Sequence, residues 1–223
     1  MPAPDRFELY AFWRSSAAYR VRVALALKGL KAHETFVDID AGEQHGEAYR
    51  AVNPMGGIPA FVDREGDGAP ITQSLAILEY LEEIHPQPAL LPQGAPARAR
   101  VRSLAALLAA DTHPLITPRV RQYLTTRGGF DPAAWRAWQE QWFGAGLRAL
   151  ERRLSTEPGT GRFCHGDTPT MADVCLASVL VVARVFKLEF DGIPTVARIM
   201  AACEGLEAFA QADPRRQAGA PAA

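Results

Sequence analysis

Residues 53–63 read NPMGGIPAFVD, a loop rich in proline and glycine that runs directly into a strand-like segment. Asn53-Pro54 and Gly56-Gly57 are loop signals. The Ile58-Pro59 step then leads into the short apolar run Ala60–Asp63. A proline is tolerated at the first position of a strand, because its missing N–H is not needed there. The segment therefore predicts a loop that delivers the chain into a sheet.

The chain before this loop follows the order strand, helix, strand. Residues 7–12 alternate apolar and polar side chains, which is typical of a strand. Ser15 and Ser16 then suit a helix N-cap, and Gly29 stands where a glycine commonly ends a helix. Residues 33–39 are rich in β-branched and aromatic side chains. This order predicts a βαβ unit with a parallel pair of strands.

The chain after the loop continues with a hairpin and a helix. Gly66–Gly68 predicts a tight turn into a short strand at Pro70-Ile71. Residues 75–81 have the apolar spacing of an amphipathic helix, and we expect Ser74 to cap it. A βαβ unit followed by two strands and a helix is the order of a thioredoxin-like domain. The sequence thus predicts an α/β domain over residues 5–86.

The second half of the chain lacks strand patterns. Several prolines interrupt the pattern between residues 86 and 96, which favours a linker. The apolar periodicity is helical after this point, so we expect an all-helical domain over residues 92–212. The last residues, 213–223, are small and proline-rich, and we expect a disordered tail. Helices are expected over residues 98–111, 132–154, 170–186 and 196–209.

The composition argues against several classes of function. The chain carries 24 Lys and Arg against 25 Asp and Glu, which counts against a nucleic-acid partner. Residues 174–185 form the most apolar stretch, and this is too short to span a bilayer. Cys164, Cys175 and Cys203 form neither a C-x-x-C motif nor a disulfide framework, and no metal site is indicated. We expect a cytoplasmic protein with no membrane partner.

Four segments stand out in order along the chain: residues 12–25 (FWRSSAAYRVRVAL), 53–59 (NPMGGIP), 73–81 (QSLAILEYL) and 166–173 (GDTPTMAD). Together they resemble the zeta class of glutathione transferases, which includes maleylacetoacetate and maleylpyruvate isomerases. The likeness covers roughly residues 7–210 and implies the glutathione-transferase fold, an α/β thioredoxin-like domain followed by an all-α domain. It also implies glutathione as cofactor, a small-molecule substrate and a homodimer.

The resemblance implies where glutathione binds in the first domain. Ser15 donates a hydrogen bond to its sulfur, with Ser16 close behind, and a helix N-terminus with hydroxyl donors lowers the pKa of a thiol. A cis Ile58-Pro59 bond lets the backbone of Ile58 pair with the cysteinyl backbone. Gln73 and Ser74 open a helix and hold the γ-glutamyl carboxylate. Judged from the residues alone, the serines equally suit ordinary helix caps.

Further contacts are implied by the resemblance outside these segments. Gln44 falls where the family contacts the glycine carboxylate, and His45 serves instead if the loop shifts; a solvated loop is the alternative. His113, Thr117 and Arg119 match a stretch of the helical domain that reaches glutathione and the substrate. A lone histidine is, however, more often structural.

Arg14 and Arg119 are the candidate clamps for the carboxylates of a dicarboxylate substrate, since arginine binds carboxylates through two parallel hydrogen bonds. For Arg14, a surface charge at a strand end is the alternative. Two departures from the family pattern stand out. Ala17 replaces a common cysteine, and Arg184 stands one position from the arginine expected before Phe186, which is about 100° of helix rotation.

The implied activity is glutathione-dependent cis–trans isomerisation of maleylacetoacetate or maleylpyruvate to the fumaryl product, in the catabolism of aromatic amino acids. Ser15, Ser16 and Arg14 are the expected catalytic residues. A general transferase that conjugates or dehalogenates small electrophiles is one alternative, and a non-catalytic binding module of the same fold is another. Thr170 and Asp173 have the spacing of a capping box, so we expect them to be structural.

Overall fold

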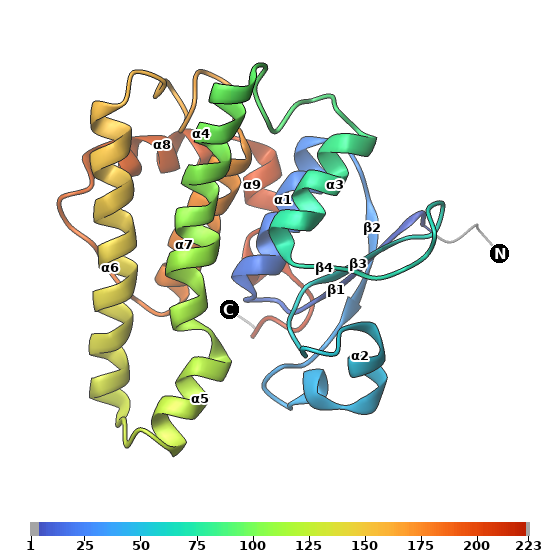
Figure 1. Cartoon of the computed structure of the whole chain (residues 1–223). Coiled ribbons are helices and arrows are strands. Elements are labelled where there is room, and N and C mark those ends of the chain that lie inside the picture. The colour runs from blue at the N-terminus through green and yellow to red at the C-terminus, as the bar shows by residue number, and fades with distance from the viewer. Residues whose placement is uncertain (1–4, 222–223) are drawn as a thin grey trace. The chain divides into compact units, whose positions relative to one another are not determined.

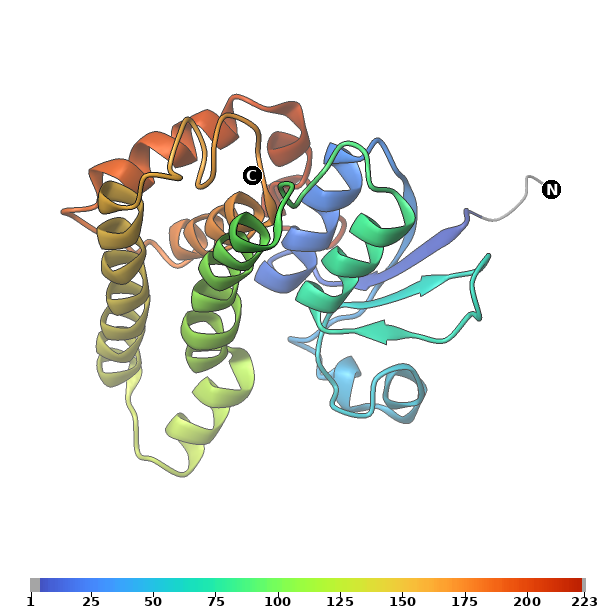
Figure 2. The same ribbon diagram turned by 45° about the horizontal axis from the view of Figure 1, so that its top comes forward.

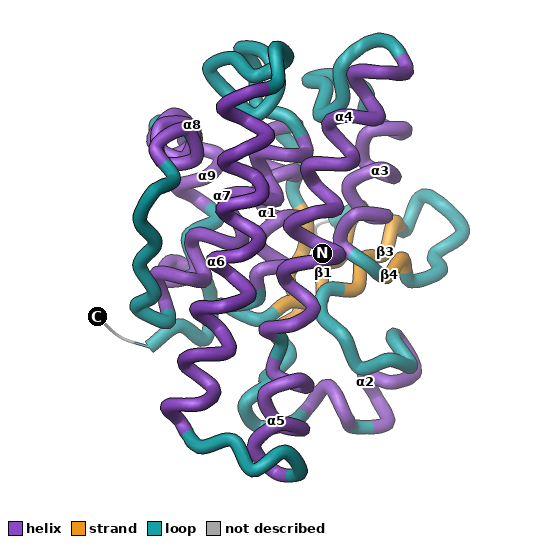
Figure 3. The backbone as a smooth tube through the Cα atoms, turned by 60° about the vertical axis from the view of Figure 1, so that its left-hand side comes forward, coloured by secondary structure: helices purple, strands orange, loops and turns teal. Residues whose placement is uncertain are grey.

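A computed structural model describes residues 5–221 and divides the chain into two compact units. The first comprises residues 5–90 and 206–221, and the second comprises residues 91–205. The four named strands all lie in the first unit, as the orange segments of Figure 3 show. The predicted order, an α/β unit followed by helices, is therefore confirmed.

The sheet of the first unit has the strand order β2-β1-β3-β4. Its strands are β1 (Phe7–Ala11), β2 (Ala32–Phe36), β3 (Ala60–Asp63) and β4 (Ile71–Thr72). β1 and β2 are parallel, whereas β3 is antiparallel to both β1 and β4. The parallel pair and the later hairpin are both as the sequence predicts.

Helices α1 (Ser16–Leu27) and α3 (Ser74–Ile84) lie side by side in this unit (Figures 1 and 2). α1 begins at the predicted N-cap, Ser15, and ends before Gly29, which has the left-handed φ of 66° that a closing glycine supplies at little cost. Apolar side chains of the strands and of both helices are fully buried and form the core. They include Leu9, Val21, Phe61, Ile77 and Leu78.

Two short elements between the second strand and the loop at 53–59 escaped the sequence analysis. They are a 3-10 turn, Glu43–His45, and the helix α2, Glu47–Val52. A helix of six residues is too short to show an amphipathic period. The strand predicted over residues 33–39 ends at Phe36, although the Val37 N–H still donates to the Ala11 carbonyl at 2.9 Å.

A buried ion pair fixes the chain that leaves α3. Lys28 Nζ lies 2.8 Å from Glu82 Oε2 and also donates to the carbonyls of His85, at 2.6 Å, and Pro88, at 2.9 Å. The same Glu82 oxygen accepts the Leu90 N–H at 2.8 Å. All three protons of the ammonium and a carboxylate oxygen are thus satisfied, as burial of charge requires. The contacts hold the segment after α3 as far as Leu90.

The second unit is built from helices. An α-helical stretch passes into a π-helical turn at Leu107–Thr112 and a 3-10 turn at His113–Ile116, so the helix predicted over 98–111 loses its α geometry near residue 107. The helix α5 (Pro118–Thr126) was not predicted. No helix among residues 5–221 is long and apolar enough to cross a membrane. The α-helices are α4 (Ala95–Ala106), α5 (Pro118–Thr126), α6 (Pro132–Thr156), α7 (Met171–Val185) and α8 (Pro194–Glu204).

The helix predicted over residues 196–209 is broken at Gly205, and its last part becomes α9 (Glu207–Gln211). α9 belongs to the first unit and packs against α1. The Tyr19 hydroxyl donates to the Phe209 carbonyl at 3.5 Å, and both residues are buried. A 3-10 turn, Pro214–Arg216, follows α9.

Candidate functional site

The strand register of the first unit brings its predicted site segments to one edge of the sheet. Tyr10, near the end of β1, pairs with Ala60, the first residue of β3. Ala60 in turn pairs with Thr72, the last residue of β4. The chain therefore enters or leaves the same edge just after β1, just before β3 and just after β4. The segments concerned are residues 12–16, 58–59 and 73–74.

Ser15 and Ser16 open α1 in different environments. Ser15 is half-buried, and its Oγ accepts the Ala18 N–H at 3.2 Å, so it is the N-cap that the sequence predicts. Ser16 is only 3% exposed. Because an N-cap serine uses its oxygen as the acceptor, its hydroxyl proton stays available for an anion. Ser15 is thus both a cap and the more accessible donor of the pair.

The loop before β3 is held by two side-chain donors. The Tyr49 hydroxyl and Asn53 Nδ2 both donate to the Gly57 carbonyl, at 2.6 Å and 2.7 Å. Burial raises the pKa of Tyr49 to about 12, which keeps the phenol protonated as a donor. The Ile58-Pro59 bond that follows is cis, as predicted.

Gly56 marks a close approach of two backbone segments in the same loop. Its φ is 65°, and a Cβ at this position would lie 2.8 Å from the Gln44 carbonyl oxygen. A side chain would therefore meet both a strained backbone and a backbone clash. The glycine lets the turn that carries Gln44 and His45 pack against the loop before β3.

The start of α3 differs from the prediction. The N-cap is Gln73, and Ser74 is the first helical residue, so the prediction that Ser74 caps the helix is wrong. Gln73 makes no side-chain cap and has a φ of 70° and a ψ of 113°, which is unusual for a residue with a side chain. Ser74 Oγ instead accepts a hydrogen bond from Arg20 Nη1 at 3.0 Å. The helix thus begins without a side-chain cap from its own sequence.

Arg20 is the residue that sequence reasoning missed. It is 1% exposed, although it is a charged residue on α1. Besides the Ser74 contact, its Nη2 lies 3.5 Å from Ser16 Oγ, at the outer limit of a hydrogen bond. The spacing of four residues from Ser16 places both side chains on one helix face. One signal was present in the sequence: a charged arginine stands inside the largely apolar run that follows Ser16.

Gln44 and His45 lie in the 3-10 turn before α2. Gln44 is buried, its Nε2 donates weakly to the Ile39 carbonyl at 3.4 Å, and its Oε1 is buried without a hydrogen-bond partner in the described chain. The His45 ring is 3.2 Å from Gln44 Nε2, and His45 is exposed. A carboxylate needs a donor. The exposed His45 is therefore the more accessible donor of the two.

Arg14 already has a carboxylate partner within its own unit. Its two terminal nitrogens lie 2.7 Å and 2.5 Å from the two oxygens of Asp40, a bidentate ion pair. The guanidinium also stacks over the rings of Phe12 and Trp13, at 5.1 Å and 5.5 Å from their centroids. Binding of a substrate carboxylate by Arg14 therefore competes with Asp40.

The candidates of the second unit share one short irregular segment. His113 opens the 3-10 turn that follows the π-helical turn, and departures of this kind from α geometry often accompany functional sites. Thr117 is the N-cap residue of α5, but its hydroxyl donates to the Pro114 carbonyl at 3.1 Å. Arg119 lies in the first turn of α5 and is exposed.

The capping box at the start of α7 is confirmed. Asp173, which has no exposed surface, accepts from the Thr170 N–H and hydroxyl, both at 2.8 Å, and from the Cys164 N–H at 2.7 Å. Burial raises the pKa of Asp173, and these hydrogen bonds oppose the rise. Arg184, near the other end of α7, forms an ion pair with Glu204 and lies largely exposed.

The three cysteines are free and buried, as expected for a chain without a disulfide framework. Burial raises the pKa of Cys164 and of Cys203, so both thiols stay protonated. Thiols of this kind are poor nucleophiles. No group of three or more possible metal ligands is found among residues 5–221.

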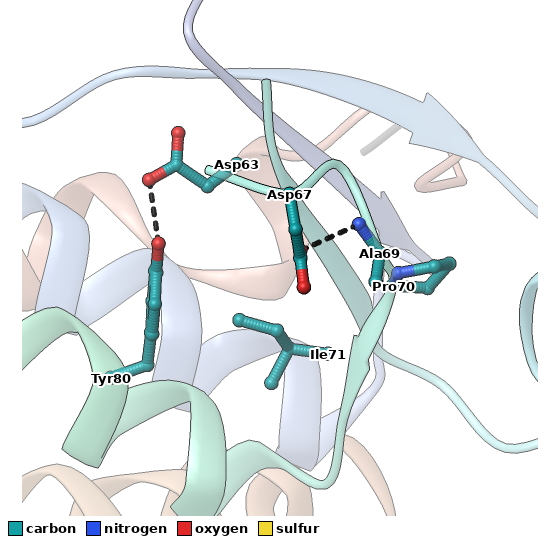
Figure 4. A pocket seen from close by; sticks show the side chains of 6 residues that line it. All are labelled: Asp63, Asp67, Ala69, Pro70, Ile71 and Tyr80. Atoms are coloured by element: carbon teal, nitrogen blue, oxygen red, sulfur yellow. Dashed lines mark hydrogen bonds between the residues drawn. The ribbon is translucent and has the colours of Figure 1, made fainter. Parts of the chain in front are cut away.

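A cavity of about 340 Å³ lies at the other edge of the sheet, where Asp63, at the end of β3, pairs with Phe7 (Figure 4). Arg6 binds both Asp63 oxygens, at 2.9 Å and 2.7 Å, and the Tyr80 hydroxyl donates to one of them at 2.7 Å. The Arg6 guanidinium holds the pKa of Asp63 well below its usual range. The carboxylate is thus satisfied internally and stands apart from the candidate site.

Comparison with known proteins reveals close relatives over nearly the whole chain. Family models of the glutathione S-transferase N-terminal and C-terminal domains match residues 6–83 and 132–212. A maleylpyruvate isomerase from a Ralstonia species is 40% identical over 210 residues, 94% of this chain and 98% of that protein. The maleylacetoacetate isomerase of Pseudomonas aeruginosa is 42% identical over 218 residues, 97% of this chain and 100% of that protein.

Solved structures agree with these relatives. A crystal structure of maleylacetoacetate isomerase from Methylobacterium extorquens AM1, with bound malonate and glutathione, has a TM-score of 0.93 and 50% identity, covering 96% of this chain and 100% of that one. The holo structure of a maleylpyruvate isomerase described as a bacterial zeta-class glutathione S-transferase has a TM-score of 0.91 and 40% identity, with the same coverage. The chain belongs to the glutathione S-transferase family, in the zeta class of maleylacetoacetate and maleylpyruvate isomerases.

Proposed function

We propose that this chain catalyses the glutathione-dependent cis–trans isomerisation of maleylacetoacetate or maleylpyruvate to the fumaryl product. One observation carries the proposal. Ser15 and Ser74 open two neighbouring helices at one sheet edge, and the oxygen of each already accepts from a donor of the protein. Their hydroxyl protons are therefore left to donate to an anion. The relatives named above supply the reaction.

Glutathione would bind along this edge, where the chain offers a partner for each part of the tripeptide. The γ-glutamyl carboxylate takes the start of α3, where Gln73 and Ser74 supply donors and the helix dipole favours an anion. The cysteinyl backbone pairs with the backbone of Ile58, in the manner of an added strand. The glycine carboxylate lies near the turn that holds Gln44 and His45, and His45 is the more accessible donor.

Ser15 stabilises the glutathione sulfur as a thiolate. Its hydroxyl donates to the sulfur, and the N-terminus of α1 adds positive potential, and both effects lower a thiol pKa. Ser16 is the first residue of α1 and is buried, so we propose that it lies behind Ser15 as seen from the sulfur. When bound, glutathione supplies a thiolate that adds to one carbon of the cis double bond, which becomes a single bond and can rotate. Expulsion of the thiolate then re-forms the double bond in the trans configuration and regenerates glutathione. The protein's own cysteines are poor candidates for this role, because all three are buried.

Two arginines are proposed for the substrate carboxylates. Arg119 is exposed at the start of α5 and is available for a bidentate contact. Arg14 becomes a clamp only when it exchanges Asp40 for the substrate. His113 and Thr117 belong to the segment that precedes Arg119, and we propose that they face glutathione and the substrate. We further propose that the protein acts as a cytoplasmic homodimer in the catabolism of aromatic amino acids.

A general glutathione transferase, conjugating or dehalogenating small electrophiles, is the second candidate. Two features favour it: Ala17 stands where the class commonly has a cysteine, and Arg184 is held by Glu204 at the surface. Such an enzyme turns over model electrophiles and isomerises maleyl compounds only weakly. A non-catalytic module of the same fold is the third candidate, and it predicts no turnover of either kind.

The test follows the disappearance of maleylacetoacetate and of maleylpyruvate with and without reduced glutathione. We expect turnover only in its presence, with no net consumption of the thiol. Consumption of one thiol per electrophile, with little isomerisation, supports the general transferase. Equal rates with and without glutathione rule out the coenzyme role.

A further inference from the structure

Arg20 joins the starts of two helices through its buried guanidinium. Its Nη1 donates to Ser74 Oγ at 3.0 Å, and its Nη2 lies 3.5 Å from Ser16 Oγ. Ser74 is 6% exposed and Arg20 is 1% exposed, so the shorter contact lies out of bulk water. Long side chains on a helix lean toward its N-terminus. Arg20 therefore reaches back over one turn of α1 toward the edge where α3 begins.

A serine hydroxyl offers one proton and two acceptor lone pairs. Because an arginine N–H can only donate, the contact from Arg20 occupies a lone pair of Ser74 Oγ. The hydroxyl proton of Ser74 then has to point elsewhere, and among the described residues no acceptor takes it. A donor that binds the oxygen also polarises the O–H bond and strengthens it as a donor.

We propose that Arg20 is a positioning residue for glutathione. By donating to Ser74 Oγ, Arg20 turns the Ser74 hydroxyl proton toward the γ-glutamyl carboxylate. The inference rests on the proposed function and deepens it. Arg20 itself does not touch the ligand in this arrangement. Its guanidinium also adds positive charge between two helix N-termini, where an anion is already favoured.

The test compares two ligands that differ only in the carboxylate. One is reduced glutathione, and the other is its analogue with a 4-aminobutanoyl group in place of the γ-glutamyl group, which lacks the α-carboxylate. Binding of both is measured by calorimetry for the wild type, Arg20→Met and Arg20→Lys. If Arg20 acts through Ser74, Arg20→Met weakens glutathione binding about 30-fold and binding of the analogue by less than about 3-fold.

Ser74→Ala provides the second arm. The double variant Arg20→Met/Ser74→Ala is expected to bind glutathione about as weakly as Ser74→Ala alone, because the two residues act on one hydrogen bond. If Arg20→Met does not fold, Arg20→Lys carries the test, since it keeps the charge but loses the planar fork, and we expect it to restore part of the selectivity for the carboxylate.

Arg22→Met is the matched control. Arg22 is also a buried arginine of α1, but it pairs with Glu34 rather than with a serine at a helix start. Its Nη1 also lies 3.5 Å from the carbonyls of Phe12 and Trp13. We expect this variant to lose stability and to keep the wild-type ratio of affinities for the two ligands, because it leaves the Ser74 hydroxyl untouched. Equal weakening of both ligands by Arg20→Met, or additive effects in the double variant, would overturn the proposal. A wild type that binds neither ligand would instead refute the proposed function.

Discussion

The N-termini of α3 and α7 differ in how their side chains cap the helix. Every helix leaves its first backbone N–H groups without a partner inside the helix. At α7 the sequence supplies its own cap, the Thr170–Asp173 capping box, whose two side chains are buried. At α3, Gln73 supplies no side-chain cap and is held at a φ of 70°, while Ser74 Oγ serves as an acceptor for Arg20.

This difference separates a structural helix start from one prepared for a ligand. The α7 start is capped by its own side chains, which are buried, so we expect its effect to be on stability alone. At the start of α3, the Ser74 hydroxyl proton is left to donate to a ligand. Gln73 also has an unfavourable backbone conformation, and strain of this kind is common at functional sites. The following variants test whether the two starts differ in this way.

Asp173→Ala is expected to have the largest effect. It removes the acceptor of two backbone N–H groups and one hydroxyl, all of them buried, and should lower the free energy of unfolding by about 4 kcal/mol. Urea denaturation measures the loss. The exposed neighbour Asp167, which accepts only the Arg162 N–H, provides the control Asp167→Ala, with a loss of about 1 kcal/mol. Altered glutathione affinity of folded Asp173→Ala would contradict a purely structural role.

Ser15→Ala tests the start of α1, where we propose that one serine both caps the helix and binds the ligand. It should lower stability by about 1 kcal/mol, since the N-cap is lost. It should also raise the pKa of bound glutathione's thiol by about 1 unit, since a donor to the thiolate is lost. Ultraviolet titration of the thiolate measures the second effect. Ser15→Thr retains a hydroxyl and serves as the control. If the thiol pKa does not rise, the thiolate is stabilised by Ser16 or by the N-terminus of α1 rather than by Ser15.

Gln73→Gly should change stability and affinity in opposite directions. Glycine adopts a φ of 70° without strain, so the free energy of unfolding is expected to rise by about 0.5–1 kcal/mol. Loss of the amide should weaken glutathione binding about fivefold. Thermal denaturation and calorimetry measure the two effects. Gln73→Asn, which tolerates the left-handed region better than most residues, is the control. A fall in stability would show that the conformation carries no cost.

Asp40→Asn is expected to have the smallest effect. The Arg14–Asp40 pair is partly exposed, so its loss should change stability by less than about 0.5 kcal/mol. If Arg14 becomes a substrate clamp, its release should lower the KM for the maleyl substrate about threefold and leave glutathione affinity unchanged. The exposed Asp67 supplies the control variant Asp67→Asn. An unchanged KM would remove Arg14 from the proposed site.

The sequence predicted the features that depend on neighbouring residues. A cap at Ser15 or Ser16 and the capping box at Thr170 were predicted from adjacent residues, and the parallel strand pair was predicted from the order of the elements. The cis Ile58-Pro59 bond was predicted as well. The cis bond came from the family resemblance rather than from local physics, since such bonds are uncommon before proline.

The features that depend on distant partners were missed. Arg20 contacts Ser74 across 54 positions, and Lys28 meets Glu82 across the same separation. No periodicity reveals such a pair. The incorrect capping role of Ser74 has the same origin, because its oxygen is used by a residue from another helix. The bidentate pair of Arg14 with Asp40 was missed for this reason too.

The packing of α9 against α1 has a consequence for biosynthesis. The first unit uses residues 206–221 as well as residues 5–90, and Tyr19 of α1 meets Phe209 of α9. A ribosome emits the N-terminal residues first, and domains commonly fold as they emerge. The helix that Ser15 caps therefore lacks its neighbour α9 until the whole second unit, residues 91–205, has been translated. Maturation of the unit that carries Ser15 is thus tied to the translation of α9.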